Sequence, residues 1–132
     1  MVYDWTNIQS QTGMLKILFD QNFNHRIIRG LAKRISNFDF ETTQSLNREN
    51  EKDPKLLELA SEMKRVTAAH DFETFPAFAY QKMSKGENIF GVVWIPADMP
   101  IGNAVDELEI VIICSEENEY ENRVEYLPLG LT

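Results

Sequence analysis

Three aspartates lie where apolar runs of the sequence give way to polar residues or where a helix pattern begins. Asp20 directly follows the apolar run Ile17–Phe19. Asp71 lies two residues beyond Ala69, where another apolar run ends, and Asp53 precedes a proline. Carboxylates that lie close together without a cationic partner repel one another, so such a cluster indicates a bound cation. Oxygen ligands favour Mg²⁺ or Mn²⁺ over zinc, and such a metal can activate water for hydrolysis.

Short apolar runs alternate with helical patterns from Met14 onward, which predicts an α/β fold with a parallel sheet covered by helices. We expect strands at 15–19, 37–46, 65–69, 89–96 and 123–129, and helices at 23–35, 54–64, 75–83 and 101–117. The run 89–96 is the most strand-like and should be central, whereas 37–46 should be an edge strand. The carboxyl ends of parallel strands share one edge, and a right-handed crossover starts the helix at Asp53 on that edge. The sequence therefore predicts that the three carboxylates meet there, with Glu73 as a fourth.

Each of these residues also has a simpler structural interpretation. Asp20 could cap the helix that follows it, and Asp53 could be only an N-cap before a proline. Asp71 could start a turn before Phe75. His70 could carry a proton beside Asp71, although an exposed loop position explains it as well. Spacing alone leaves both interpretations open for every residue.

Composition narrows the class of protein. The 132 residues, 43% of them hydrophobic, suit one folded domain, here assigned to residues 14–132 with 1–13 as a poorly ordered N-terminal extension. The net charge of −8 argues against a protein that coats nucleic acid by neutralising phosphates, but it suits a site that holds cations. We find no membrane-length apolar stretch and no leader pattern, and expect a cytoplasmic protein. The single Cys114, flanked by isoleucines, should be a small core residue.

Two stretches resemble PIN-like proteins. LKILFDQNFNHRIIRGLAKRI, residues 15–35, resembles their opening strand, which ends in Asp followed by Glu or Gln and then Asn. DPKLLELASEMKRVTAAHDFETF, residues 53–75, resembles their second signature, an acidic residue that opens a helix and then a strand that ends in an Asp-centred motif. The resemblance covers about Met14 to Leu129. It implies a three-layer PIN-like fold with a mainly parallel central sheet of four or five strands.

The resemblance also implies a function, because PIN domains are typically metal-dependent ribonucleases and many are toxins of toxin–antitoxin pairs. It implies that Asp20, Asp53 and Asp71 are the catalytic and metal-binding positions. Asn22 would support them, and Glu73 stands where many relatives carry a second Asp.

The expected function is therefore Mg²⁺- or Mn²⁺-dependent hydrolysis of RNA by a cytoplasmic toxin that a small antitoxin protein neutralises, with a homodimer left open. The alternative is a non-catalytic interaction module whose acidic edge binds a partner protein. Two further residues bear on this choice. Gln21 occupies a place often held by Glu, and Arg26 could reach a substrate phosphate, although a solvated basic helix face explains Arg26 more simply.

Overall fold

All five strands of the central sheet run parallel, in the order β2-β1-β3-β4-β5. The computed structural model describes residues 14–129, so the expected extension at 1–13 lies outside the described residues. Along the chain the elements are β1 (Ile17–Phe19), α2 (His25–Arg34), β2 (Phe40–Thr42), α3 (Asp53–Glu62), β3 (Val66–Ala69), α4 (Thr74–Ser84), β4 (Val92–Trp94), α5 (Ile101–Cys114) and β5 (Val124–Tyr126). The predicted α/β class with a parallel sheet is confirmed.

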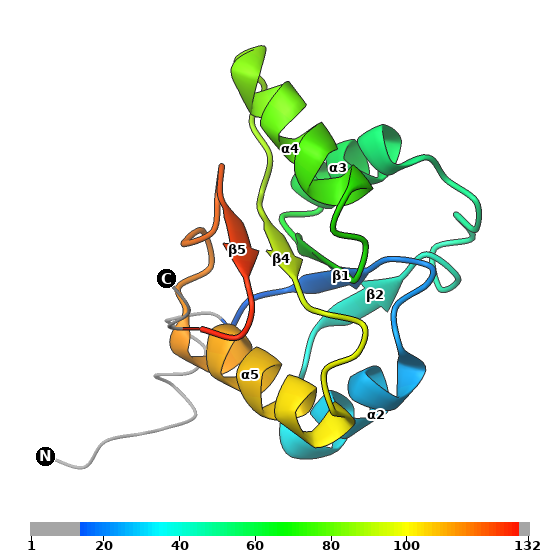
Figure 1. Ribbon diagram of the computed structural model, residues 1–132, viewed down its shortest axis with the longest axis vertical. Coiled ribbons are helices and arrows are strands. Elements are labelled where there is room, and N and C mark those ends of the chain that lie inside the picture. The colour runs from blue at the N-terminus through cyan, green and yellow to red at the C-terminus, as the bar shows by residue number, and fades with distance from the viewer. Residues whose placement is uncertain (1–13, 130–132) are drawn as a thin grey trace, which may run out of the picture.

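The helices form the two outer layers of a three-layer structure. Helices α2 and α5 pack together on one face of the sheet, and α3 and α4 pack together on the other (Figure 1). Alternate strand residues point to opposite faces, so Ile17 and Phe19 belong to the core under α2 and α5, whereas Leu18 belongs to the core under α3 and α4. Helices α2 and α5 approach closely at Gly30, where a Cβ atom would lie 2.7 Å from a methyl carbon of Val105.

The strand register brings the carboxyl ends of β1 and β3 side by side. Phe19 pairs with Ala68, and the backbone N–H of Asp20 donates to the carbonyl of Ala68 at 3.1 Å. On the other side of β3, Ala69 pairs with Trp94. The residues that follow β1, β3 and β4 therefore lie along one edge of the sheet, as the topology of a parallel sheet requires.

Three details differ from the sequence predictions. Asp53 is the first residue of α3 and Lys52 is its N-cap, so the interpretation of Asp53 as an N-cap is wrong. The middle strand is β3, and β4 lies one place further out. Cys114 is exposed, not part of the core, because the buried stripe of α5 continues from Val111 to Ser115. The predicted edge position of the second strand is confirmed by β2.

None of the helices within residues 14–129 combines the length and the apolar character that crossing a bilayer requires.

Candidate active site at the carboxyl edge of the sheet

The carboxylates of Asp20, Asp53 and Asp71 lie within electrostatic range of one another. The pKa of Asp53 is raised to about 6, first by burial and then by the charges of Asp20 and Asp71. The pKa of Asp20 is also raised, first by burial and further by the charge of Asp71, although backbone N–H groups of Gln21 and Asn22 oppose the shift. The loop after β1, the loop after β3 and the first turn of α3 thus carry their aspartates to one region.

This acidic cluster, defined as Asp20, Asp53 and Asp71, is not neutralised by basic side chains of the described structure. None of the ion pairs between residues 14 and 129 includes any of the three carboxylates. His70 is the only group of basic type among the causes that shift the pKa of Asp20, and it is a minor one. Such a region of negative potential attracts a cation.

Asp71 differs from the other two aspartates because its carboxylate is engaged within its own turn. The backbone N–H groups of Glu73 and Thr74 both donate to its Oδ1 at 3.0 Å, and the Thr74 hydroxyl donates to its Oδ2. These hydrogen bonds lower the pKa of Asp71, with the Thr74 hydroxyl as the largest cause. The simpler interpretation, a turn before the next helix, therefore holds for Asp71, which stays ionised while its position is fixed.

Asp20 does not cap the following helix. The N-cap of α2 is Asn24, whose Oδ1 accepts from the backbone N–H of Arg26 at 2.9 Å. Asp20 instead receives hydrogen bonds from the backbone N–H groups of Gln21 and Asn22. Asn22 supports the carboxylate through its main chain, and both Asn22 and Arg26 are exposed.

The loop that leads to Asp53 is fastened to the end of β1 by Gln21. The Oε1 of Gln21 accepts from the backbone N–H of Asn50 at 2.5 Å, and its Nε2 donates to the Asn50 side chain at 3.4 Å. The Gln44 side chain also donates to the Gln21 carbonyl at 3.4 Å. A glutamate at position 21 would lack the N–H group that donates to Asn50, so the glutamine suits this loop.

His70, at the end of β3, joins the segments that follow β1 and β4. Its ring lies flat on the ring of Phe23, with centroids 4.2 Å apart. Its Nε2 accepts from the backbone N–H of Asn24 at 3.2 Å, and its Nδ1 lies 3.0 Å from the carbonyl of Ile95. A neutral ring with its proton on Nδ1 satisfies both contacts. The interpretation of His70 as an exposed loop residue is therefore wrong, and its ring nitrogens are occupied by structural contacts.

A divalent cation suits the donor chemistry of the acidic cluster, but not as a closed protein cage. No group of three or more His, Cys, Asp or Glu side chains within the described residues is placed to hold a metal ion. Mg²⁺ commonly binds one or two carboxylates and keeps several waters. Asp20 and Asp53 fit that mode because burial and like charge disfavour their ionised forms without a cation.

Glu73, expected as a fourth ligand, is exposed and lies at the N-cap of α4. Its backbone N–H contacts Asp71, but its charge is not among the causes that shift the pKa values of the three aspartates. The structure therefore brings together Asp20, Asp53 and Asp71, and leaves Glu73 at the margin of the cluster.

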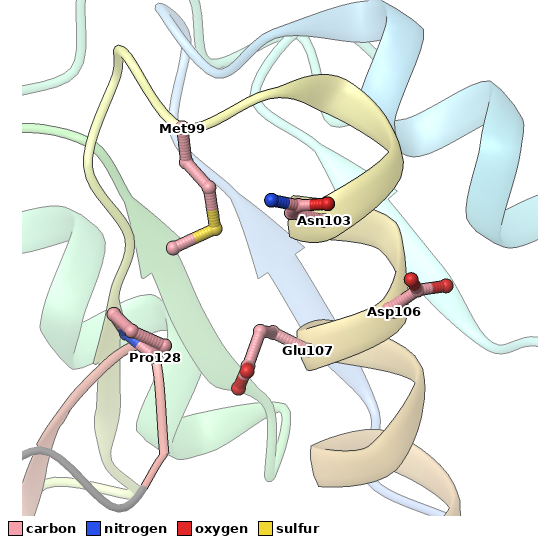
Figure 2. Close-up of a pocket in the computed structure, with 5 residues that line it drawn as sticks. All are labelled: Met99, Asn103, Asp106, Glu107 and Pro128. Atoms are coloured by element: carbon pink, nitrogen blue, oxygen red, sulfur yellow. The ribbon is translucent and has the colours of Figure 1, made fainter.

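A cavity of about 300 Å³ lies elsewhere, between α5 and the segment after β5. It is lined by Met99, Asn103, Asp106, Glu107 and Pro128, and none of the three aspartates borders it (Figure 2). Glu107 accepts from the backbone N–H of Leu129 at 2.9 Å, and Asp106 pairs with Arg34. Both carboxylates thus have partners within the protein and hold neighbouring segments in contact. We therefore do not take this cavity as the candidate site.

The sequence interpretation overlooked a group of aromatic side chains at the same edge. Phe72 follows Asp71, Trp94 ends β4 and Tyr126 ends β5. The signal was available, because the strand-end rule that located the aspartates applies equally to aromatic residues.

Comparisons of the chain with protein-family models, with curated proteins and with solved structures found no match.

Proposed function

We propose that this protein is a Mg²⁺- or Mn²⁺-dependent ribonuclease of the PIN-like kind, which acts in the cytoplasm as the toxin of a toxin–antitoxin pair. The observation that carries the proposal is the pKa of Asp53, which burial first, and then the charges of Asp20 and Asp71, raise to about 6. Acidic groups with raised pKa values at the carboxyl edge of a parallel sheet are typical of a functional site. The resemblance to PIN-like proteins supplies the substrate class and the small antitoxin partner.

In this proposal the three aspartates of the acidic cluster have different roles. A bound divalent cation would supply Lewis acidity toward a phosphate and a water of lowered pKa. Asp20 and Asp53 would hold the cation, since neutralisation of their repulsion favours binding. Asp71 is ionised and fixed by its turn, so it would contribute a constant negative charge that helps to retain the cation.

A second candidate function is a non-catalytic module that binds the basic surface of a partner protein through the acidic cluster. One observation favours it: within residues 14–129 no three potential ligands are placed to hold a metal ion together. The same unpaired carboxylates that attract a cation also attract Lys and Arg side chains.

An RNA-cleavage assay tests the proposal. The purified wild type, Asp20→Asn and the control Asp98→Asn would be incubated with labelled single-stranded RNA in Mg²⁺ and in chelator. Asp98 is exposed in the loop before α5, outside the acidic cluster. We expect Mg²⁺-dependent cleavage by the wild type and the control, and a loss of about a hundredfold or more in Asp20→Asn.

Two results would contradict the ribonuclease. One is a wild type that cleaves no RNA with either metal. The other is cleavage that survives both the chelator and Asp20→Asn, because such activity comes from a contaminant. Either result would leave the interaction module as the better explanation.

A further inference from the structure

Four aromatic side chains form a cluster beside the acidic cluster, and we call Phe72, Tyr80, Trp94 and Tyr126 the aromatic patch. The ring centroid of Phe72 lies 5.0 Å from that of Trp94 and 5.9 Å from that of Tyr126. Trp94 and Tyr126 are 5.8 Å apart, and the hydroxyls of Tyr80 and Tyr126 are hydrogen-bonded at 3.0 Å. The patch therefore joins the ends of β3, β4 and β5 with one side chain of α4.

The patch is unusually open to solvent for apolar side chains. Phe72 is 58% exposed, Tyr80 49% and Tyr126 37%. Among residues 14–129, the other exposed large apolar side chains are Ile110 and Ile113, which lie on α5. Exposed apolar side chains that gather in one place mark a binding surface.

Contacts on either side hold Phe72 in place. Trp94, which it touches, donates its indole N–H to the carbonyl of His70 at 2.8 Å. The turn that contains Phe72 is closed by the hydrogen bonds of Asp71 to residues 73 and 74. The exposed ring is thus positioned before any ligand arrives, which lowers the entropy cost of binding.

We propose that the aromatic patch stacks the unpaired bases of a single-stranded RNA and so leads the strand to the acidic cluster. This inference rests on the proposed ribonuclease function. Stacking of bases on aromatic rings is a general means of binding single strands. Bases within a duplex have their faces covered, so the patch should select single strands.

The position of the patch favours RNA over a protein partner. Phe72 is the residue next to Asp71, so a base stacked there brings its phosphates near the carboxylates that would hold the cation. The hydroxyl of Tyr126 is neutral near pH 7, as that of any tyrosine is, and burial and then the hydrogen bond with Tyr80 raise its pKa to about 12. It therefore adds no charge that would repel a phosphate.

The test measures binding without cleavage. A fluorescein-labelled single-stranded RNA of about ten nucleotides would be titrated with protein in chelator, with the matching duplex as a second probe. We expect Phe72→Ala and Phe72→Leu to weaken single-strand binding by about tenfold or more, and Phe72→Trp to restore it. Ile113→Ala, which also removes exposed apolar surface but does so on α5, should bind as the wild type does.

Leucine separates stacking from simple apolar contact, because it keeps the apolar area but has no aromatic face. Wild-type affinity in Phe72→Leu, equal affinity for duplex and single strand, or no binding by the wild type would each overturn the inference. So would a change in self-association of Phe72→Ala without a change in RNA affinity, because the occupant would then be a second copy of the chain.

The cleavage assay keeps this inference separate from the ribonuclease proposal. A wild type that cleaves RNA but shows no dependence on Phe72 would overturn the stacking inference alone. A wild type that binds single strands through Phe72 but never cleaves them would overturn the ribonuclease alone.

Discussion

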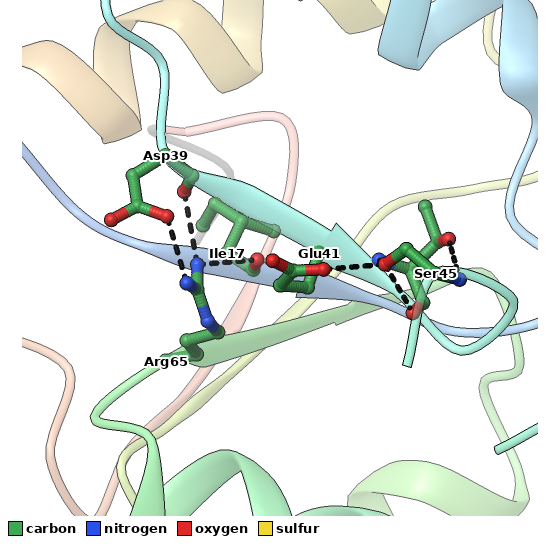
Figure 3. A network of polar contacts seen from close by, with 6 residues as sticks. Ile17, Asp39, Glu41, Ser45 and Arg65 are labelled. Carbon is green, nitrogen blue, oxygen red and sulfur yellow. Dashed lines mark hydrogen bonds and ion pairs between the residues drawn. The ribbon is translucent and has the colours of Figure 1, made fainter. Parts of the chain in front are cut away.

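At the amino edge of the sheet a buried arginine is paired with an aspartate, whereas at the carboxyl edge three carboxylates lie without such a cation. Arg65, 8% exposed, places its Nη2 2.7 Å from the Asp39 carboxylate. Its Nη1 also donates to the carbonyls of Asp39 and Ile17, at 3.2 and 3.4 Å (Figure 3). The charge at the amino edge is therefore balanced within the chain, whereas the charge of the acidic cluster is not.

The comparison shows how charge balance can distinguish charged residues that stabilise the fold from those that serve a function. A balanced pair joins strands, and removal of its buried partner alone destabilises the fold. An unbalanced cluster weakens the folded protein and persists where a ligand or partner restores the balance. Removal of the charge should therefore destabilise the protein at Arg65, and stabilise it at Asp20 and Asp53 of the acidic cluster.

The largest effect is expected at the amino edge. Arg65→Ala removes a buried side chain that contacts β1 and the residue before β2, and should lower the free energy of unfolding by about 2 to 3 kcal/mol. The loss stays below that of a fully buried pair because the Asp39 side chain is 52% exposed and can be hydrated. Urea denaturation measures this loss as a lower midpoint of unfolding at an unchanged slope. The control is Lys33→Ala, at an exposed position on α2. A loss equal to that of the control would show that Arg65 does not join the strands.

At the carboxyl edge Asp20→Asn should stabilise the metal-free protein. Relief of burial and of repulsion from Asp71 would be worth about 1 to 2 kcal/mol, and nearer the lower figure because solvent screens a partly exposed group. Mg²⁺ or Mn²⁺ should raise the melting temperature of the wild type, since a ligand of the folded state stabilises it, and the variant should lose most of this response.

Melting curves in chelator and across a metal titration measure both effects, with Asp98→Asn as the control. If Asp20→Asn melts below the wild type in chelator and neither metal shifts the wild type, Asp20 has a structural role and the two edges do not differ as described.

Asp53 should make stability depend on pH. Its folded-state pKa of about 6 lies above the ordinary value of 3.8, so the folded state binds the proton more tightly than the unfolded state. The stabilisation by that proton is complete below about pH 4 and is lost as the pH rises through about 6. After a discount for solvent screening, Asp53→Asn should exceed the wild type in stability by about 1 kcal/mol at neutral pH. The measurement is the urea midpoint of both proteins from about pH 4 to pH 7. A difference between the two midpoints that stays the same at every pH would contradict the prediction.

Asp71 should respond in the opposite direction, although it belongs to the same cluster. Asp71→Ala removes the acceptor of two backbone N–H groups and the Thr74 hydroxyl, and should cost about 0.5 to 1 kcal/mol. The lowered pKa of Asp71 means that its stabilisation is present above the unfolded value and is lost as the pH falls below about 4. Thermal melting at neutral and acidic pH measures this, and Asp71→Ser, which can still accept a hydrogen bond, should recover part of the loss.

Topology explains which parts of the site the sequence could predict. Asp20, Asp53 and Asp71 could be assigned to one edge because the ends of parallel strands and the starts of crossover helices follow from the order of elements. The partners of each side chain do not follow from that order. The residues around Asp71 in the sequence do not show whether its carboxylate is free or accepts hydrogen bonds from Thr74. A free carboxylate in the cluster would destabilise the folded protein, whereas a hydrogen-bonded one stabilises it.

The other differences arise from contacts between distant segments. His70 is fixed by Phe23, Asn24 and Ile95, which lie far from it in the sequence. Cys114 was misplaced because its isoleucine neighbours suggested a core position, whereas Ile113 is itself 40% exposed. A few neighbouring apolar residues show that a helix has a buried face. Which of them lie on that face depends on the apolar residues three and four positions apart along the whole helix.

The two outer strands of the sheet bear on how the protein behaves when concentrated. β2 and β5 span three residues each, and the middle residue is Glu41 in one and Glu125 in the other. An exposed strand offers unpaired N–H and C=O groups on which a strand of another molecule can add, and short, charged outer strands oppose this growth. The sheet is therefore protected at both sides against edge-to-edge aggregation, even though its core strands are strongly apolar.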